Sequence, residues 1–332
     1  MNVLRILKKE WFLLALFAMI ALASAWPALG KSGGLLHLDA FSNLGVALIF
    51  FLTGLGLPLK ELAGGLKRWR IHLLVQLSTF LVFPLLGLAL VLVFKPWLPA
   101  DLSLGFAYLC ALPSTISSSI AMTQMARGNV PAAIFNASIS SLLGIVLTPA
   151  ILVFTAHVGG HGALSFIDAV LKLGQLVALP LLAGQLARPL LAGWHQRNRR
   201  YTGSIDRLVI LLLVLGAFSD SVEAGLWRNY GAELLVEALL GAALLLAFAL
   251  VLTTWAARRA HFSTEDEITA VFCGSKKTLA SGIPMAKLIF GAVPGLGLIV
   301  LPIMFYHQLQ LIACSVLAGR YARRRAISPQ AD

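Results

Sequence analysis

Two adjacent lysines stand inside a segment that is otherwise apolar enough to cross a lipid bilayer. The segment covers residues 268–290, and Lys276 and Lys277 lie near its middle, between Ser275 and Thr278. A lysine at the centre of a membrane costs about 2.5–3.5 kcal/mol on insertion scales. The pair lies too deep for its amines to reach the interface easily by extending their side chains. We therefore expect both amines to serve a function.

The chain offers these amines no carboxylate at a matching depth. Its acidic residues are predicted to lie in loops or near the ends of spans. The one placed deepest in the membrane is Glu237, one turn into a span. Three explanations for the charge remain open: acceptance by carbonyls at a helix C-terminus, a neutral lysine, or an anion that arrives from outside. We favour the anion.

A second polar interruption follows Pro113 inside another apolar segment. Pro113 lacks an amide hydrogen, and the hydroxyls behind it, Thr115 and residues 117–119, are small hydrogen-bonding ligands. A broken helix exposes N-terminal amides that suit anions and carbonyls that suit cations, and paired interruptions are typical of transporter binding sites. The alternative is a proline kink whose hydroxyls bond back to their own chain.

Weaker candidates lie in three other apolar segments. Asn136 and Ser140 are four residues apart and share a helix face, but simple hydrogen bonding between helices explains them equally well. The same alternative applies to Gln76, and a lone buried histidine such as His307 is more often structural. The predicted substrate or ion site comprises Gln76, Thr115, Ser117, Ser118, Ser119, Asn136, Ser140, Ser275, Lys276, Lys277, Thr278 and His307.

Composition places the chain in the membrane class. Of 332 residues, 59% are hydrophobic and only 12% are charged, whereas soluble domains carry about 25% charged residues. The net charge of +12 does not indicate a nucleic-acid partner, because the basic residues are in alternate loops. No nucleophile–base pattern, P-loop or zinc motif is present, so the sequence predicts neither an enzyme nor a resident cofactor or metal.

Ten apolar segments are long enough to be membrane spans. The first, which follows basic residues, also resembles a signal peptide with a small-residue cleavage site, but its apolar run is long for one. The expected class is therefore an all-α integral membrane protein whose spans are roughly 11–29, 38–57, 71–93, 101–126 (broken), 131–156, 168–187, 205–222, 233–257, 268–290 (broken) and 294–319.

Basic residues predict the topology. The loops on one side hold only Lys31, Lys95 and Arg228. Lysine and arginine are enriched in cytoplasmic loops, so we expect both termini in the cytoplasm, with the chain in a bacterial inner membrane. The residues on the predicted cytoplasmic side are Arg5, Lys8, Lys9, Lys60, Lys67, Arg68, Arg70, Arg127, Arg188, Arg197, Arg199, Arg200, Arg258, Arg259, Arg320, Arg323, Arg324 and Arg325.

The two broken spans occupy equivalent places in successive sets of five. Because five is odd, the second set enters the membrane with opposite polarity, as the second half of an inverted repeat does. We expect one transmembrane domain over residues 1–332, with a first repeat over about 11–156 and a second over about 168–319.

Several short segments together resemble the bile acid:sodium symporter family, and the match is closest to its YfeH-like bacterial branch, which also resembles the seventh animal member. They extend over spans two to ten. The segments are FFLTGL at 50–55, LPSTISSS at 112–119, RGNV at 127–130, FNAS at 135–138, FCGSKK at 272–277 and LPIMFYHQ at 301–308.

This resemblance implies ten helices in two inverted repeats, divided into a panel and a core. The panel would comprise about 11–57 and 168–222, and the core about 71–156 and 233–319, with the broken helices four and nine crossing inside the core.

The chain departs from the sodium-coupled branch of the family at its ion ligands. That branch carries a glutamate and a glutamine on helix nine, and the aligned positions here hold Phe272 and Lys276. The helix-five hydroxyls of that branch align with Ala133 and Ala137. An ammonium could therefore stand where a sodium ion sits, and no metal site is predicted.

The sequence predicts a secondary transporter, of symporter type, that moves an anionic small molecule by alternating access. Lys276 and Lys277 would neutralise the anion, the hydroxyls would hydrogen-bond it, and Gln76, Asn136 and His307 would form a second tier. One alternative is a sodium-coupled symporter for bile-acid-type organic anions, and another is a non-transporting membrane regulator or sensor. Na⁺ or H⁺ is the candidate coupling ion, the lipid bilayer is the expected partner, and the oligomeric state stays open.

Overall fold

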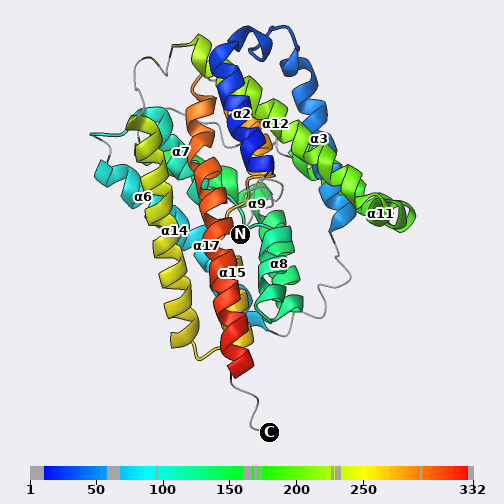
Figure 1. Cartoon of the computed structure of the whole chain (residues 1–332), viewed down its shortest axis with the longest axis vertical. Coiled ribbons are helices and arrows are strands. Elements are labelled where there is room, and N and C mark those ends of the chain that lie inside the picture. The colour runs from blue at the N-terminus through cyan, green and yellow to red at the C-terminus, as the bar shows by residue number, and fades with distance from the viewer. Residues whose placement is uncertain are drawn as a thin grey trace. The chain divides into compact units, whose positions relative to one another are not determined.

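The computed structural model of the chain is helical throughout the part that it describes (Figure 1). Six of the basic residues used for the topology prediction, Arg5, Lys8, Lys9, Lys60, Lys67 and Lys95, lie outside that part, as do the side chains of Arg199, Arg200, Arg324 and Arg325. The described residues are 11–57, 68–94, 96–159, 167, 171, 174–225, 228, 233–291 and 294–327.

The chain divides into two compact units, each assembled from separate stretches of sequence. Unit 1 comprises residues 1–57, 167–235 and 280–301, and unit 2 comprises 58–166, 236–279 and 302–332. The helices of unit 1 are α2 (Trp11–Ala25), η1 (Pro27–Leu29), α3 (Leu38–Gly56), η4 (Gly174–Ala178), α11 (Leu179–Arg197), α12 (Arg199–Glu223) and α16 (Gly282–Phe290).

Unit 2 holds the remaining helices. Two long ones, α14 (Glu233–Arg259) and α17 (Leu296–Ile327), begin within unit 1 and lie mostly in unit 2. The others are α5 (Trp69–Leu77), the π-helical turn η3 (Ser78–Val82), α6 (Phe83–Phe94), α7 (Ala100–Ala111), α8 (Ser117–Met125), α9 (Val130–Gly159) and α15 (Thr264–Gly274).

In unit 1, helix α3 packs closely against α11, and two glycines make that approach feasible. A side chain at Gly54 would collide with the carbonyl of Leu181, and one at Gly184 would collide with the carbonyl of Phe51. The amide of Gln185 donates to the carbonyl of Gly54 at 2.5 Å and to that of Leu57 at 2.8 Å, so it satisfies the C-terminal end of α3. Small residues that bring backbones together are typical of membrane helix packing.

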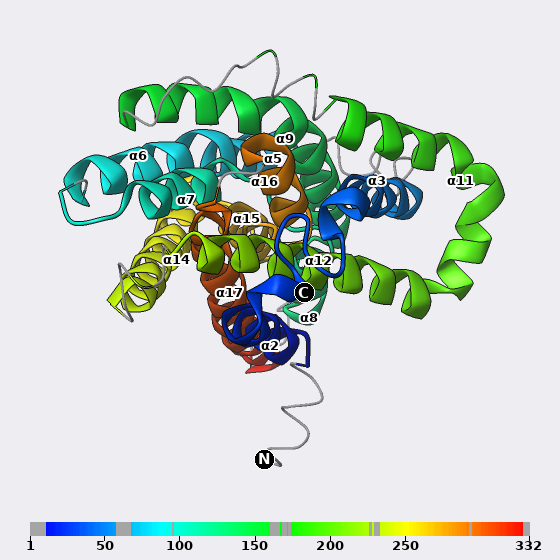
Figure 2. The same cartoon turned by 90° about the horizontal axis from the view of Figure 1, so that it is seen from above.

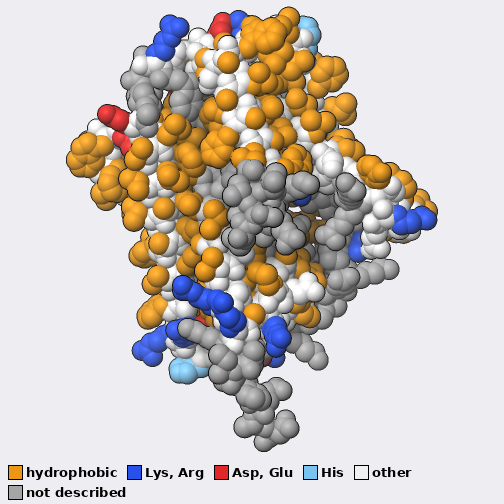
Figure 3. Space-filling model, in the orientation of Figure 1, with side chains coloured by type: hydrophobic (Ala, Val, Ile, Leu, Met, Phe, Trp, Pro, Cys, Tyr) orange, Lys and Arg blue, Asp and Glu red, His pale blue; other side chains and the backbone are white. Residues whose placement is uncertain are grey.

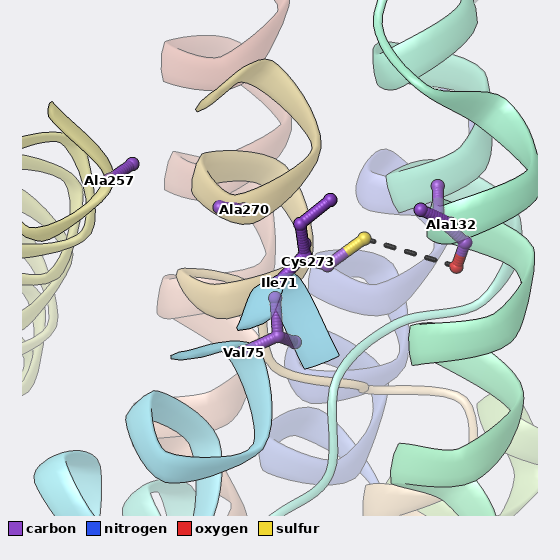
Figure 4. Packing of buried hydrophobic residues seen from close by; sticks show 7 residues of the cluster. Ile71, Val75, Ala132, Ala257, Ala270 and Cys273 are labelled. Carbon is purple, nitrogen blue, oxygen red and sulfur yellow. Dashed lines mark hydrogen bonds between the residues drawn. The ribbon is translucent and has the colours of Figure 1, made fainter. Parts of the chain in front are cut away.

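In unit 2, helices α5, α9 and α15 pack around a cluster of small side chains. Figure 4 shows Ile71 and Val75 from α5 beside Ala132, Ala270 and Cys273, and the Cys273 thiol lies 3.9 Å from the carbonyl of residue 133. Figure 2 shows α5 and α9 running alongside each other. Because these side chains are short, the three backbones come close enough for polar groups on one helix to reach carbonyls on the next.

Five helical segments have the length and apolar character needed to cross a bilayer: Trp69–Phe94, Val130–Thr155, Gly174–Arg197, Glu233–Arg259 and Leu296–Arg323. Shorter apolar helices accompany them. Many large hydrophobic side chains are exposed along these helices, as the orange surface in Figure 3 shows. An apolar exterior of this extent belongs in lipid rather than water.

Two predicted boundaries are wrong for the same reason. The sequence placed residues 188–204 in a loop, but α11 continues to Arg197 and α12 begins at Arg199. It also placed Glu265–Glu267 outside a span, whereas α15 begins at Thr264 and buries Asp266 and Glu267. An apolar run marks the part of a helix that faces lipid, and a helix continues past that run wherever polar residues find water or partners.

Candidate functional site

The chain leaves the helix at both predicted interruptions. Residues 112–116 separate α7 from α8, and residues 275–281 follow α15. The two unwound segments bond to each other within unit 2. The amide of Thr278 donates to the carbonyl of Pro113 at 3.1 Å, and the hydroxyl of Ser114 donates to the carbonyl of Cys273 at 2.6 Å. The breaks thus satisfy much of their own backbone, as they must inside an apolar medium.

Lys277 is fully buried, and its amine sits in a cradle of backbone carbonyls. Its Nζ donates to the carbonyls of Thr79, Cys110 and Leu112 at 2.9, 2.8 and 2.7 Å. An ammonium has three N–H donors, so this set uses all of them. The amine also lies 4.2 Å from the centre of the Phe83 ring, a cation–π contact.

Each of the three carbonyls is available for a local reason. Cys110 and Leu112 lie at the C-terminal end of α7, where carbonyls lack helical partners and the helix dipole is negative. Thr79 lies in the π turn, where the amide of Phe83 bonds back to Ser78 rather than to Thr79. In the same i+5 pattern, the Thr79 carbonyl would accept the amide of Pro84. Proline has no amide hydrogen, so this carbonyl is left for Lys277.

Two of the acceptors for Lys277 are therefore carbonyls at a helix C-terminus, the first of the three explanations that the sequence left open, and the third is a carbonyl of the π turn. The favoured explanation, an external anion, is not needed to satisfy this residue. Among the described residues, no carboxylate pairs with either lysine.

Lys276 is held by fewer groups. Its Nζ donates to the carbonyl of Ser118 at 2.9 Å and lies 5.6 Å from the centre of the Phe272 ring. The side chain is buried, yet Ser118 is half-buried and Ser117 is exposed. The amine thus stands directly behind an accessible edge of α8, with donor capacity beyond the one carbonyl bond that the described residues supply.

The predicted hydroxyls form a chain in which Ser117 takes no part. Ser118 Oγ donates to Thr115 Oγ1 at 2.8 Å, Thr115 Oγ1 lies 2.7 Å from Ser119 Oγ, and Ser119 donates to the carbonyl of Phe272 at 3.1 Å. Ser275 bonds back to the carbonyl of Val271 at 2.6 Å. Most of these hydroxyls are therefore engaged by the protein itself, mainly by one another and by α15 rather than by their own helix turn.

Three further predicted residues, Gln76, Asn136 and Ser140, lie in two different neighbourhoods. Gln76 donates to the carbonyl and side-chain oxygens of Asn136, at 3.2 and 3.3 Å, while Ser140 accepts the amide of Ser114 at 2.9 Å. The bonds of Gln76 join α5 to α9, whereas Ser140 ties α9 to the unwound segment after α7. Neither Asn136 nor Ser140 has a direct contact with the lysines.

His307 reaches the lysines through a neighbour. Gln310 accepts the amide of Lys277 and donates to its carbonyl, both at 2.8 Å, and its Nε2 lies 2.9 Å from His307 Nδ1. Tyr306 donates to the carbonyl of Ser275 at 2.6 Å. Gln310 and Tyr306 thus fix the unwound segment that carries both lysines.

The carbonyl cradle itself was not predictable from the sequence. Thr79 and Phe83 carry no polar signal that separates them from other span residues, and the carbonyl that Thr79 contributes belongs to every residue type. Pro84, beside them, is the sequence feature that could have pointed to a free acceptor there.

Two buried carboxylates at the N-terminal end of α15 form ion pairs with exposed arginines. The Asp266 carboxylate accepts hydrogen bonds from Arg68 at 2.8 Å and from Asn129 at 2.9 Å. The Glu267 carboxylate lies 3.1 Å from the Arg258 guanidinium. Within the described residues, no group of three or more His, Cys, Asp or Glu side chains is placed to hold a metal ion.

Comparison with known proteins places the chain in a family. The family described as "SBF-like CPA transporter family" matches residues 10–323. An uncharacterized protein of Pseudomonas aeruginosa is 46% identical over 95% of this chain and 93% of its own length. The protein named "Putative symporter YfeH" of Escherichia coli is 42% identical over 98% and 96%. "Sodium/bile acid cotransporter 7" of Danio rerio is 31% identical over 96% and 95%.

Proposed function

Because the chain belongs to the SBF-like CPA transporter family, and is therefore a multi-pass membrane secondary transporter rather than an enzyme, we propose that its substrate is an anionic small molecule bound at Lys276. One observation carries the proposal. A buried amine lies behind an accessible edge, and no carboxylate among the described residues neutralises it. A cation kept at that depth without a mate is a functional candidate.

The start of α8 supports the same ligand. Ser117, Ser118 and Ser119 form its first turn, and no side chain caps that turn. Amides at a helix N-terminus and the positive end of its dipole favour an anion. An anion that contacts this turn and Lys276 would meet one full charge and several N–H donors. The hydroxyls of Thr115 and Ser118 would supply further bonds by rotating away from each other.

Lys277 has a different role in this proposal. Its amine fills a ring of carbonyls of the kind that unwound helices offer to cations. We assign it the role of a permanent internal cation. It occupies carbonyls that could otherwise bind a sodium ion. The coupling ion in this scheme is H⁺, or the anion moves without one.

Sodium coupling is the second candidate, because relatives that are 31% identical carry the name sodium/bile acid cotransporter. A sodium ion would then use other carbonyls or the hydroxyl chain. Bile-acid-type organic anions are the corresponding substrate class.

The remaining architecture is part of the same proposal. It comprises ten spans, two inverted five-helix repeats over about 11–156 and 168–319, and a panel that moves against a core during alternating access. We place the chain in a bacterial inner membrane with both termini in the cytoplasm. The excess of arginine and lysine in alternate loops supports this orientation.

The substitution Lys276→Ala tests the proposal. A thermal-shift screen of anions on the purified protein first identifies a stabilising ligand, and uptake of that anion into proteoliposomes is then measured. We expect Lys276→Ala to fold but to lose both the stabilisation and the uptake. Lys287→Ala, which removes a lysine from α16 in unit 1, is the matched control and should retain both.

Full activity in Lys276→Ala would remove this residue from the site. Stabilisation by an anion without any flux in the parent protein would instead support the alternative of a membrane sensor.

A further inference from the structure

A groove of about 870 Å³ lies on the surface of unit 2 between α14 and α17. Its lining is apolar at one end and basic at the other. The apolar end includes Val251, Val316 and Leu317, the basic end includes Arg259, His261 and Arg320, and Trp255 lies between them along α14.

The change from apolar to basic follows the axis of both helices. On α14, Val251, Trp255 and Arg259 are spaced four residues apart, and on α17, Val316 and Arg320 are four residues apart, so each set shares a helix face. From Val251 to Arg259 the helix rises about 12 Å. The groove therefore fits a long ligand with an apolar body and an anionic head.

The basic end carries charge that the described residues do not neutralise. Arg258 is bound by Glu267 through contacts of 3.1–3.2 Å. Arg259 and Arg320 are exposed, and neither takes part in an ion pair with any of the described acidic residues. Two unpaired guanidiniums that border one groove suit a phosphate, because their planar donors match its oxygens.

His261 occupies a position where glycine is the usual residue. Its φ is 55°, in the left-handed region, and it ends α14 with bonds from its own amide to Arg258 and from Phe262 to Ala257. Most helices with this cap have glycine here, because a side chain in this conformation costs energy. The chain nevertheless keeps an imidazole here, at the basic end of the groove.

The basic end of the groove falls at headgroup depth. Helix α14 has 27 residues and is apolar enough to span a bilayer, and its length of about 40 Å exceeds the hydrocarbon thickness of about 30 Å. Its terminal arginines thus lie at an interface, and the neighbouring tryptophan is a residue type enriched at that level. Figure 3 shows Lys and Arg side chains gathered at the lower end of the view, below the apolar surface.

We propose that this groove is a binding site for an anionic phospholipid. Arg259 and Arg320 bind the headgroup phosphate, and His261 contributes a further donor. An acyl chain lies along Val251 and Val316. The apolar half of the groove favours a lipid over a free phosphate ion, which would leave that half without a ligand. Basic pockets between membrane helices bind anionic headgroups in this way.

The test compares lipids on the full-length protein. Thermal unfolding is measured in phosphatidylcholine nanodiscs with and without a fixed fraction of phosphatidylglycerol. We expect phosphatidylglycerol to raise the unfolding temperature of the parent protein. The double variant Arg259→Gln/Arg320→Gln should lose most of that increase. Arg323→Gln removes one exposed arginine that does not line the groove and should behave as the parent.

Native mass spectrometry of the same variants provides an independent readout. Lipid retention is counted only on ions of the folded protein, so a fraction of unfolded variant does not affect it. The parent should retain phosphatidylglycerol at least several-fold more often than the double variant does. Equal retention by the two proteins, an equal loss in Arg323→Gln, or equal stabilisation by inorganic phosphate in detergent would each overturn the proposal. So would a lipid-independent dimer that the double variant disrupts, because a second copy would then occupy the groove.

Discussion

At the scale of single residues, Lys276 and Lys277 differ in how many acceptors surround each amine. Lys277 has three carbonyls within 2.9 Å, and Lys276 has one. A buried acceptor that loses its donor costs about 1–3 kcal/mol. The two residues are neighbours with the same chemistry, but removing them should have different consequences for stability and for ligand binding.

We predict that Lys277→Ala lowers the free energy of unfolding by about 3 kcal/mol or more, because it orphans three buried carbonyls. Lys276→Ala removes one bond from a carbonyl that α8 also satisfies internally, so its effect on stability should be smaller, about 1 kcal/mol. Thermal unfolding of both variants in detergent measures the difference. Na⁺ should partly restore Lys277→Ala and leave the parent unchanged, since a sodium ion can enter the emptied cradle. Equal destabilisation by the two variants would contradict the assignment.

The lysines stand out in the sequence, but their ligands do not. A charged pair in an apolar segment stands out by residue type, and the hydroxyls after Pro113 stand out in the same way. The acceptors are backbone carbonyls, which every residue possesses. Only the packing of α7 and the π turn against the unwound segment selects those of Thr79, Cys110 and Leu112.

At the scale of elements, the π turn and the two breaks act together. The break after α7 exposes two carbonyls, and the π turn exposes a third on a different helix. Irregular backbone inside a membrane persists only where another group satisfies it. The lysine therefore stabilises the very irregularities that surround it. This mutual dependence predicts an energetic coupling between residues that do not touch through their side chains.

Pro84→Ala tests that coupling. The substitution restores an amide hydrogen that can bond the Thr79 carbonyl in the π register, so the carbonyl would no longer depend on Lys277. We expect a double-mutant cycle of Pro84→Ala with Lys277→Ala, followed by thermal unfolding, to give an interaction energy of about 0.5–3 kcal/mol. Pro99→Ala, in the loop before α7, is a proline control that should show no coupling to Lys277. Additive effects of Pro84→Ala and Lys277→Ala would mean that the proline serves packing alone.

Helix positions were predictable from apolar runs, whereas helix ends were not. Apolar runs predicted the five helical segments of the described part that are long enough to cross a bilayer, because a bilayer demands apolar residues. The ends of α11 and α15 lie beyond those runs, and in α15 the extension depends on Arg68, Asn129 and Arg258, which are distant in sequence from Asp266 and Glu267. Pairings of that kind leave no local pattern.

At the scale of the whole molecule, family and composition agree on a membrane transporter, and the open question is what drives it. The proposed internal cation bears on this question directly. The resemblance to the family predicts that Lys276 stands where the sodium-coupled branch has a sodium ligand, and in the structure the neighbouring amine of Lys277 fills a carbonyl cradle. In the proposed scheme, these two amines supply the positive charge that a transported cation supplies in a sodium-coupled symporter.

We therefore predict that uptake of the stabilising anion into proteoliposomes does not depend on a sodium gradient. The comparison uses vesicles with an inward Na⁺ gradient, with the same concentration of choline, and with an inward H⁺ gradient in choline. Equal initial rates with sodium and choline support the fixed-charge scheme. A higher rate with the H⁺ gradient would identify the proton as the coupling ion. Uptake that requires sodium would instead show that an ion site persists elsewhere in the fold, and Lys277 would then be a structural residue that holds the two breaks together without replacing the transported cation.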